Sequence, residues 1–290
     1  QLDGGYSLVM MSAQKLIAVR DPHGFRPLCI GTLHDGGYVI ASESCALAAV
    51  GAEFLRDVQP GELIVITQDS KLISDTSRVN TVPRSMCIFE YIYFSRPDSV
   101  PDGVSVHSAR RRAGALLAQA HPANADVVIG VPDSGLDAAL GYAEAAGIPY
   151  GIGLIKNKYI GRTFIAPDGR FDKVKIKLSA IEETVRGKRI VLIDDSIVRG
   201  TTMRQIVEML REAGAQEVHV RISSPPFLYP CFYGTDVPNA HQLIASEHST
   251  QEICREIGAD SLAYLAIEDF RLMLGDLPVC AACFDQQYPV

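Results

Sequence analysis

The stretch RIVLIDDSIVRGTT, residues 189–202, decides how the second half of the sequence folds. Residues 189–193 predict a buried β-strand, and the Ser/Gly/Thr-rich turn that follows the two aspartates leads into a helical pattern over 201–213. In an open α/β sheet, ligands bind beyond the carboxyl ends of the strands, which places Asp194 and Asp195 at the edge of a crevice. Two neighbouring acids suit a sugar diol or an indirectly held Mg²⁺, and a helix N-terminus suits a phosphate. The segment therefore predicts one site for a sugar, a metal ion and a phosphate.

The acid pair by itself also has a simpler interpretation, a helix cap with one solvated carboxylate. A buried strand, two acids, and hydroxyl groups beside a glycine favour the ligand site when they occur together. Two other nucleotide motifs are excluded, because the sequence has no G-x-x-x-x-G-K-[ST] loop and the glycines at 151 and 153 lack the rest of a dinucleotide fingerprint. Nucleoside triphosphate hydrolysis and hydride transfer are therefore disfavoured.

Two further segments carry candidate site residues. VIGVPDSG at 128–135 predicts a strand, a turn and a helix start, with Asp133 or Ser134 as a plain helix cap in the simpler interpretation. KNKYIGRTF at 156–164 is a basic loop, and most charge runs are solvated faces. Beside an anion site, however, such a loop is also consistent with a mobile lid over the substrate.

The chain is predicted to change character near residue 80. Short apolar runs separated by turn-rich clusters predict antiparallel β-structure over residues 6–77, with a linker at 77–84. After residue 106, strands alternate with helices, which predicts a parallel sheet with helices on both faces. The expected helices are 108–120, 134–146, 201–213 and 250–257, and the expected strands are 126–131, 150–155, 189–193, 217–222 and 262–267.

Composition and charge narrow the class of protein. The 290 residues are 47% hydrophobic, enough for a sizeable core, and as a soft prior the length predicts about two domains. The net charge is −7 and no long Lys/Arg run is present, which disfavours a nucleic-acid partner. Apolar runs are too short for a membrane span, so a soluble cytoplasmic protein is expected. The chain opens with Gln1 inside a patterned segment, and we expect that an upstream part is missing.

The segment at 194–202 resembles the phosphoribosylpyrophosphate (PRPP) motif of type I phosphoribosyltransferases. The resemblance extends to the glutamine PRPP amidotransferase family, and it is carried by CIFEYIYFSRPDS at 87–99, GVPDSG at 130–135, GLIKNKYIGRTFI at 153–165 and SPPFLYPCFYG at 224–234. It implies an α/β fold, the type I phosphoribosyltransferase parallel sheet with helices on both faces. A β-rich remnant of an N-terminal-nucleophile glutaminase sandwich would precede it. Residues 1–80 would be the last part of the glutaminase domain, and residues 81–290 the phosphoribosyltransferase domain with a C-terminal cysteine segment.

The resemblance implies that ammonia released from glutamine displaces pyrophosphate from PRPP, giving 5-phosphoribosylamine in the first committed step of purine synthesis. The family's nucleophilic N-terminal cysteine is not in this sequence, and the amide of Gln1 cannot replace a thiolate, so we expect no glutamine hydrolysis by the chain as given. Two alternatives are a purine-base salvage phosphoribosyltransferase and a PRPP-sensing regulator without catalysis. The salvage enzyme would not be expected to share the segments at 87–99 and 224–234, and the regulator would need a DNA-binding module.

Residue roles also follow from the resemblance. Ser134, Asp194 and Asp195 would lie near Mg²⁺ and the ribose, with the two aspartates and Arg162 as the catalytic set. The 5-phosphate would be bound by five residues of the turn and helix start, Ser196, Arg199, Gly200, Thr201 and Thr202. The pyrophosphate, or an inhibitory purine nucleotide, would be bound by Lys156, Lys158 and Arg162. A homo-oligomer, specifically a homotetramer, is expected.

Seven cysteines in a long chain without an export signal argue against a secreted disulfide framework. Cys280 and Cys283 form a C-x-x-C, and spacing alone does not choose between zinc and an iron–sulfur cluster. The resemblance implies a structural [4Fe–4S] cluster on Cys87, Cys231, Cys280 and Cys283, because one branch of the family carries cysteines in these positions. For the other three, Cys29, Cys45 and Cys254, we expect plain burial.

Overall fold

The chain forms two compact units built from separated stretches of sequence. The computed structural model describes residues 2, 4–157, 177–235, 237 and 239–289. The first unit comprises Gln1–Ala109, Pro230–Pro238 and Leu274–Val290, and the second comprises Arg110–Tyr229 and Asn239–Met273. The first unit thus joins three stretches of sequence, whereas the predicted division near residue 80 is a single cut. That assignment of domains stays a prediction.

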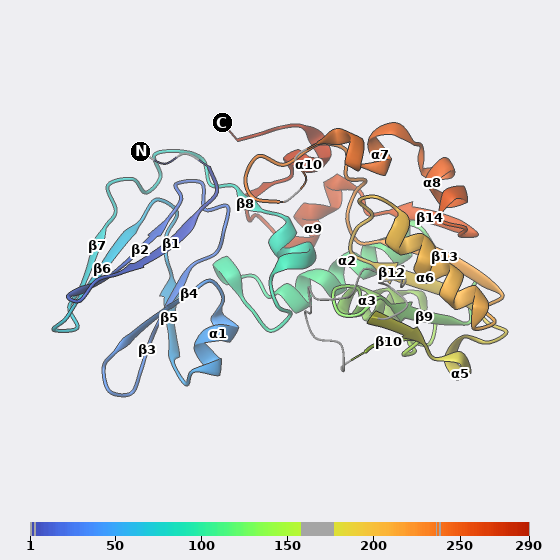
Figure 1. Ribbon diagram of the computed structural model, residues 1–290, viewed down its shortest axis with the longest axis horizontal. Coiled ribbons are helices and arrows are strands. Elements are labelled where there is room, and N and C mark those ends of the chain that lie inside the picture. Colours follow the sequence, from blue (N-terminus) through green and yellow to red (C-terminus); the bar gives the residue numbers. More distant parts are fainter. Residues whose placement is uncertain (1, 3, 158–176, 236, 238, 290) are drawn as a thin grey trace, which may run out of the picture. The chain divides into compact units, whose positions relative to one another are not determined.

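Two antiparallel sheets form the N-terminal part of the first unit. Their strand orders are β1-β2-β6-β7 and β4-β3-β5 (Figure 1). Buried apolar side chains from both sheets, among them Ala18, Ile30 and Ile64, pack into one cluster. The predicted β-rich N-terminal part is therefore confirmed, and a short helix that the sequence did not predict, α1 (Ser44–Ala49), follows β4. The strands are β1 (Ser7–Met11), β2 (Lys15–Arg20), β3 (Cys29–Thr32), β4 (Tyr38–Ala41), β5 (Glu53–Asp57), β6 (Leu63–Thr67) and β7 (Leu72–Asp75).

The rest of the first unit brings its distant stretches together. Strand β8 (Met86–Cys87) pairs in parallel with β15 (Val279–Cys280). A π-helical turn, η1 (Glu90–Phe94), follows β8, and π-helical turns are often found at functional sites. The 3₁₀ turn η2 (Pro101–Gly103) and the short helix α10 (Ala282–Asp285) complete this part.

The second unit is built on a four-stranded parallel sheet in the order β14-β13-β12-β9. All residues of β9 and all but the first of β12 are buried. Continuous apolar runs of this kind are typical of parallel strands covered on both faces. The predicted parallel sheet is therefore confirmed. Its strands are β9 (Val127–Gly130), β12 (Arg189–Asp194), β13 (Glu217–Ile222) and β14 (Ser261–Tyr264).

Helices cover both faces of this sheet. Helices α6 (Thr201–Glu212) and α8 (Thr250–Glu256) share a core with Ile190 and Leu192 of β12. Successive strand residues point to opposite faces, so the equally buried Val191 faces the other side, where α3 packs against β9 and β12 (Figure 1). Helix α3 spans Leu136–Ala146. The helices and 3₁₀ turns not yet named are α2 (Val106–Ala120), α5 (Glu182–Val185), α7 (Ile244–Glu247), α9 (Phe270–Leu274), η3 (Ala240–Gln242) and η4 (Ile267–Asp269).

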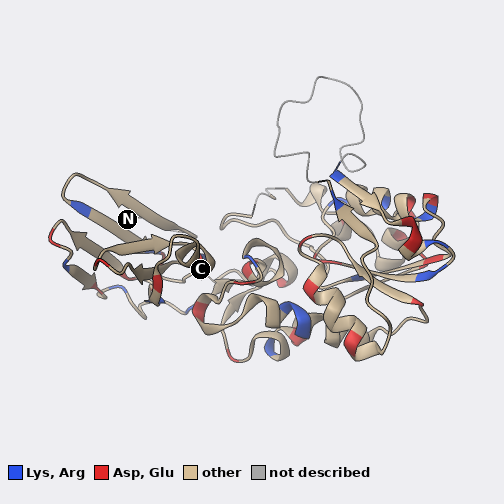
Figure 2. Ribbon diagram, turned by 90° about the horizontal axis from the view of Figure 1, so that it is seen from below, with Lys and Arg blue, Asp and Glu red and all other residues tan. Residues whose placement is uncertain are grey.

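Lys and Arg are interspersed with Asp and Glu along the second unit (Figure 2). None of the helices in the described ranges combines the length and apolar character needed to cross a membrane.

The strand expected at 150–155 is only partly present. Leu154–Lys156 forms β10, which pairs with β11 (Leu178–Ala180) in a separate antiparallel ribbon, and Tyr150 makes only an isolated bridge to Val128. Glycines lie between the two parts at 151 and 153, and a strand interior with glycine has no side chain to pack. A continuous strand was therefore the wrong expectation.

Candidate functional site

The two turns that carry the predicted motifs leave the parallel sheet from adjacent strands at the same edge. Strands β9 and β12 pair so that Gly130 stands opposite Ile193, and β12 ends one residue later, at Asp194. The Val131 amide then donates a hydrogen bond to the Ile193 carbonyl at 2.8 Å. A Cβ atom on Gly135 would lie 2.5 Å from that carbonyl oxygen, so only glycine allows the turn to lie this close.

Asp195 is fixed by hydroxyl groups from both turns. Ser134 donates to Oδ1 at 2.5 Å, and Ser196 donates to Oδ2 at 2.6 Å. Hydrogen bonds to an ionised acceptor are short and roughly twice as strong as neutral ones. The carboxylate is only 8% exposed. The structure thus brings together three of the sequence-predicted site residues.

Asp194 lies beside Asp195 and is equally buried. Its Oδ1 accepts the backbone N–H of Asp195 at 2.9 Å. Burial raises the pKa of Asp194 well above its ordinary value, and the neighbouring Asp195 charge raises it further. A ligand that donates hydrogen bonds or brings positive charge would favour the ionised form of Asp194. The pair is therefore poised to bind a diol or a cation.

The turn after β12 opens directly into helix α6. Gly200 adopts φ +77°, a left-handed conformation that glycine populates without steric cost, and the helix begins at Thr201. Thr201 and Thr202 are exposed, so their hydroxyl groups face solvent at the helix N-terminus. Unpaired N–H groups and the helix dipole favour an anion at such a position. This end of α6 is the site expected for the 5-phosphate.

Arg199 extends from the same turn. Its Nη2 donates to Gln242 Oε1 at 2.7 Å. A hollow of about 320 Å³ lies beside it. Its lining residues are Arg199, His241, Gln242, Leu243, Ile244, Glu247 and His248.

Lys156, at the end of β10, is held against the turn after β9. Its Nζ lies 2.5 Å from Asp133 Oδ2, and both side chains are more than half exposed. Exposed ion pairs of this kind contribute little to stability, so the contact chiefly restricts where the ammonium group lies. The two other predicted cations, Lys158 and Arg162, lie outside the described residues.

Two contacts of the site were missed by sequence reasoning. Asp133 pairs with Lys156, and its place inside the GVPDSG segment was the available signal. Gln242 pairs with Arg199 across 43 positions, and no pattern in the sequence connects the two.

The carboxylates of the second unit are the available ligands for a metal ion at this site. Among the described residues, no group of three or more His, Cys, Asp or Glu side chains could hold a metal ion. Mg²⁺ usually keeps several waters and is held by one or two carboxylates together with substrate phosphates. Asp194 and Asp195 offer the carboxylates for that mode, so they fit an ion brought in with the substrate rather than one caged by protein.

The four cysteines expected to act together converge in the first unit. Cys87 in β8 stands opposite Cys280 in β15. Burial raises the pKa of the Cys283 thiol, and the sulfurs of Cys87, Cys280 and Cys231 raise it further. The Tyr233 amide donates to the Cys231 sulfur at 3.3 Å. Stretches far apart in the sequence therefore bring four thiol groups to one place.

The spacing of these thiols bears on which group they could bind. They do not form a group that could hold a single metal ion. An iron–sulfur cluster inserts iron and sulfide between its four thiolates and so accepts a wider arrangement than one tetrahedral zinc. All seven cysteines are free. Cys29 and Cys45 are buried as expected, Cys29 in an apolar cluster with Leu47, whereas Cys254 is half-buried. Four thiols are a donor set that an iron–sulfur cluster accepts.

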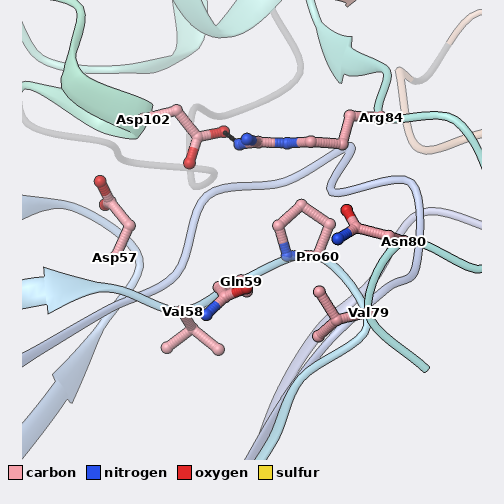
Figure 3. A pocket seen from close by; sticks show the side chains of 8 residues that line it. All are labelled: Asp57, Val58, Gln59, Pro60, Val79, Asn80, Arg84 and Asp102. Atoms are coloured by element: carbon pink, nitrogen blue, oxygen red, sulfur yellow. Dashed lines mark ion pairs between the residues drawn. The ribbon is translucent and has the colours of Figure 1, made fainter. Parts of the chain in front are cut away.

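A second polar hollow, of about 280 Å³, lies in the first unit and contains none of the predicted site residues (Figure 3). Asp102 is held there by Arg20, which donates to both its carboxylate oxygens at 2.8 Å, and by Arg84 at 3.3 Å. Asp57 points toward Asp102 (Figure 3). Burial, and then the Asp102 charge, raise the pKa of Asp57 to about 6.

Comparison with known proteins agrees with this geometry. Residues 106–223 match the phosphoribosyl transferase domain family. An amidophosphoribosyltransferase of Bacillus subtilis is 53% identical over 296 residues, which cover 99% of this chain and 62% of the relative. One of Pyrococcus horikoshii is 54% identical and covers 100% of this chain and 63% of the relative. Over its whole length the chain is therefore similar to members of the amidophosphoribosyltransferase family.

A solved structure of this family gives the same result for the fold. Glutamine PRPP amidotransferase from B. subtilis, complexed with ADP and GMP, is 51% identical with a TM-score of 0.89. The match covers 99% of this chain and 64% of that one. The second unit therefore has the type I phosphoribosyltransferase fold, preceded by a β-rich part. The chain spans a little under two thirds of the length of these relatives.

Proposed function

We propose that this chain carries the phosphoribosyl-transfer site of an amidophosphoribosyltransferase. Ammonia would displace pyrophosphate from PRPP and give 5-phosphoribosylamine, the first committed step of purine synthesis. The observation that carries the proposal is the Asp195 carboxylate, held between Ser134 and Ser196 beside the buried Asp194. This carboxylate lies in the turn that precedes the N-terminus of α6, where a sugar and its phosphate can be bound together.

The residues of the site suit the charges that develop in this reaction. Breaking the bond between C1 and pyrophosphate builds positive charge on the ribose and negative charge on the leaving group. The carboxylates of Asp194 and Asp195 would hold the ribose hydroxyls and stabilise the positive charge nearby. The N–H groups at the start of α6 would hold the 5-phosphate, and Lys156 would face the pyrophosphate. Catalysis is then mainly positioning and electrostatic stabilisation.

Asp194 and Asp195 would hold Mg²⁺, which when bound would supply positive charge that offsets the negative charge of the leaving group. Ammonia is a neutral nucleophile, so the site needs no general base to activate it. In the full-length enzyme the ammonia would come from the side-chain amide of glutamine, the compound named in the B. subtilis glutamine PRPP amidotransferase.

Purine nucleotides are proposed as regulatory ligands of this chain. A relative was solved in complex with ADP and GMP. Nucleotides share the ribose 5-phosphate part of PRPP, so the groups that hold the substrate's ribose and phosphate can hold theirs. Lys156 would meet the added negative charge of a nucleotide, as proposed for pyrophosphate.

A structural [4Fe–4S] cluster on Cys87, Cys231, Cys280 and Cys283 is proposed for the first unit. The convergence of four thiols supports it, and a structural role is favoured because ammonia transfer moves no electrons. Analysis of the purified protein for iron and acid-labile sulfide tests it, with equal amounts expected and one zinc per chain as the contradicting result. A cytoplasmic homotetramer is also proposed, and size-exclusion chromatography with light scattering measures the oligomeric state.

The decisive experiment supplies ammonium directly to the purified chain and measures PRPP-dependent release of pyrophosphate. We expect turnover in the unmodified chain and a loss of about 100-fold or more in Asp195→Ala, since removal of one preorganised electrostatic group commonly costs that much. Replacing ammonium by a purine base should give no turnover.

A matched control removes an acid on the exposed face of α6. Glu208 is half exposed and pairs across the helix surface with Arg204, at 3.0 Å, so Glu208→Gln should keep normal turnover. Normal turnover in Asp195→Ala, or turnover with a purine base alone, would refute the proposed function.

A further inference from the structure

Arg26, in the first unit, connects two of the stretches that carry the cysteines. Its Nη1 donates to Glu90 Oε1 at 2.7 Å, in the π-helical turn after Cys87. Its Nη2 donates to the Gly234 carbonyl at 2.7 Å, three residues after Cys231. One guanidinium group thus joins the stretch that follows Cys87 to the stretch that follows Cys231.

The surroundings of Arg26 keep its charge close to these sulfurs. Its guanidinium carbon lies 4.5 Å from the centre of the Phe94 ring, within the range of a cation–π contact. The Arg26 side chain is 21% exposed, and its ion-pair partner Glu90 is 7% exposed. Arg26 is therefore a partly buried cation whose two hydrogen-bond partners closely follow Cys87 and Cys231 in the sequence.

The residue before Arg26 supports the same arrangement through the backbone and its ring. The Phe25 carbonyl accepts the Cys87 N–H at 3.0 Å. The Phe25 ring stacks on Tyr233, with centroids 4.3 Å apart, and the Tyr233 amide donates to the Cys231 sulfur. The position of Arg26 is therefore set by the residues that hold the cysteines themselves.

We propose that Arg26 is a positioning residue of the four-cysteine site, which ties the stretches at 87–94 and 231–234 together and offsets the negative charge of the bound cluster. This inference rests on the cluster in the proposed function. Four thiolates give an iron–sulfur cluster a net negative charge, and a desolvated charge is costly unless a counter-charge is near. Only a side chain with several fixed donors could both bridge Glu90 to Gly234 and supply that charge.

The test compares Arg26→Gln, Arg26→Lys and Phe94→Leu with the unmodified chain. Iron and acid-labile sulfide per chain are measured first, and then the rate at which anaerobic protein loses iron to a chelator. Arg26→Gln should lose iron about tenfold faster, because it removes charge-assisted hydrogen bonds. Arg26→Lys keeps the charge but not the bridge and should fall between. Phe94→Leu should lose iron about two- to threefold faster, the loss expected of an exposed cation–π contact.

Arg56→Gln is the matched control in the same unit. Arg56 makes a comparable two-fold contact with Glu62, at 2.7 and 2.8 Å, and should leave iron release unchanged. If Arg26→Gln does not fold, iron release from Arg26→Lys still measures the effect of losing the link between Glu90 and Gly234. Iron release from Phe94→Leu measures the effect of losing the ring contact. An iron-release rate equal to the unmodified chain in Arg26→Gln, or in both Arg26→Lys and Phe94→Leu, would overturn the role of Arg26.

The outcomes also separate this inference from the proposals on which it stands. Unmodified chain without iron would refute the cluster and the role of Arg26 together. Ammonia-dependent pyrophosphate release, measured on the same preparations, tests the proposed phosphoribosyl-transfer activity independently of the cluster. If the unmodified chain holds iron and Arg26→Gln releases it at the same rate, the proposed cluster is retained and only the proposed role of Arg26 is rejected.

Discussion

The sugar-phosphate site of the second unit and the cysteine site of the first are assembled in different ways. The sugar-phosphate site is made by two short turns that leave adjacent parallel strands, and the site residues of each turn lie in one contiguous segment. The cysteine site takes its cysteines from three stretches of sequence, which are joined by one two-residue strand pair and by side chains such as Arg26. A site on strand ends is specified locally, whereas a site between distant stretches depends on tertiary contacts.

The local assembly of the sugar-phosphate site is tested most directly by replacing the Asp194 carboxylate with a neutral amide. In Asp194→Asn, ammonia-dependent turnover should fall about 100-fold or more. The raised pKa means that the folded chain binds the Asp194 proton more tightly than the unfolded chain, so ionisation at neutral pH opposes folding. The neutral amide should therefore leave the midpoint of thermal unfolding unchanged or higher, as measured by calorimetry at neutral pH.

The same measurement has a clear contradicting outcome. If Asp194→Asn unfolds at a distinctly lower temperature while keeping its turnover, the residue is a structural cap, as in the simpler interpretation of the sequence. Loss of turnover with unchanged iron content would show that the two sites are independent, which is what local assembly of the sugar-phosphate site implies.

How far the sequence predicts each site follows from this difference. The segment at 189–202 predicts its strand, its turn and its helix, because period and capping signals are local. The same reasoning failed at 150–155, where two glycines interrupt the strand. Residue patterns could not identify Arg26, because its contacts join positions 64 and 208 apart. They could not place Cys231 near Cys87 either, and only the family resemblance grouped the four cysteines.

A second prediction concerns long-range charge contacts in the first unit. The pKa of Asp57 is raised to about 6 by burial and by Asp102, against about 3.9 in the unfolded chain. Its favourable contribution is therefore fully present below the unfolded pKa and is lost as pH rises through about 6. Between pH 4 and 7 this should lower the free energy of unfolding of the first unit by on the order of 2 kcal/mol. Urea titrations over this pH range should show the decline in the unmodified chain and a smaller one in Asp57→Asn.

Matched controls keep this test specific. Asp35→Asn changes an exposed turn acid in the same unit and should retain the pH dependence of the unmodified chain. Identical pH profiles in Asp57→Asn and Asp35→Asn would contradict the electrostatic role of Asp57. Neither variant should change ammonia-dependent turnover, since both residues belong to the first unit.

The smallest effect expected is the loss of one hydroxyl at Asp195. Ser134→Ala removes the hydrogen bond that joins the turn after β9 to the turn after β12, but Ser196 still donates to the other oxygen. Net contributions of hydrogen bonds to charged groups run to about 1.5–3 kcal/mol, and with one donor remaining we expect kcat/KM for PRPP to fall about tenfold. A loss confined to KM would place Ser134 in ground-state binding, and a loss in kcat would place it in orienting Asp195 for the transition state. Because Ser134 and Ser196 come from different turns, Ser196→Ala should cost about as much as Ser134→Ala only if both turns contribute equally to holding Asp195. A double variant that costs no more than either single one would show that the two hydroxyls act on Asp195 as one unit, whereas a cost equal to the sum of the two would show that they act independently.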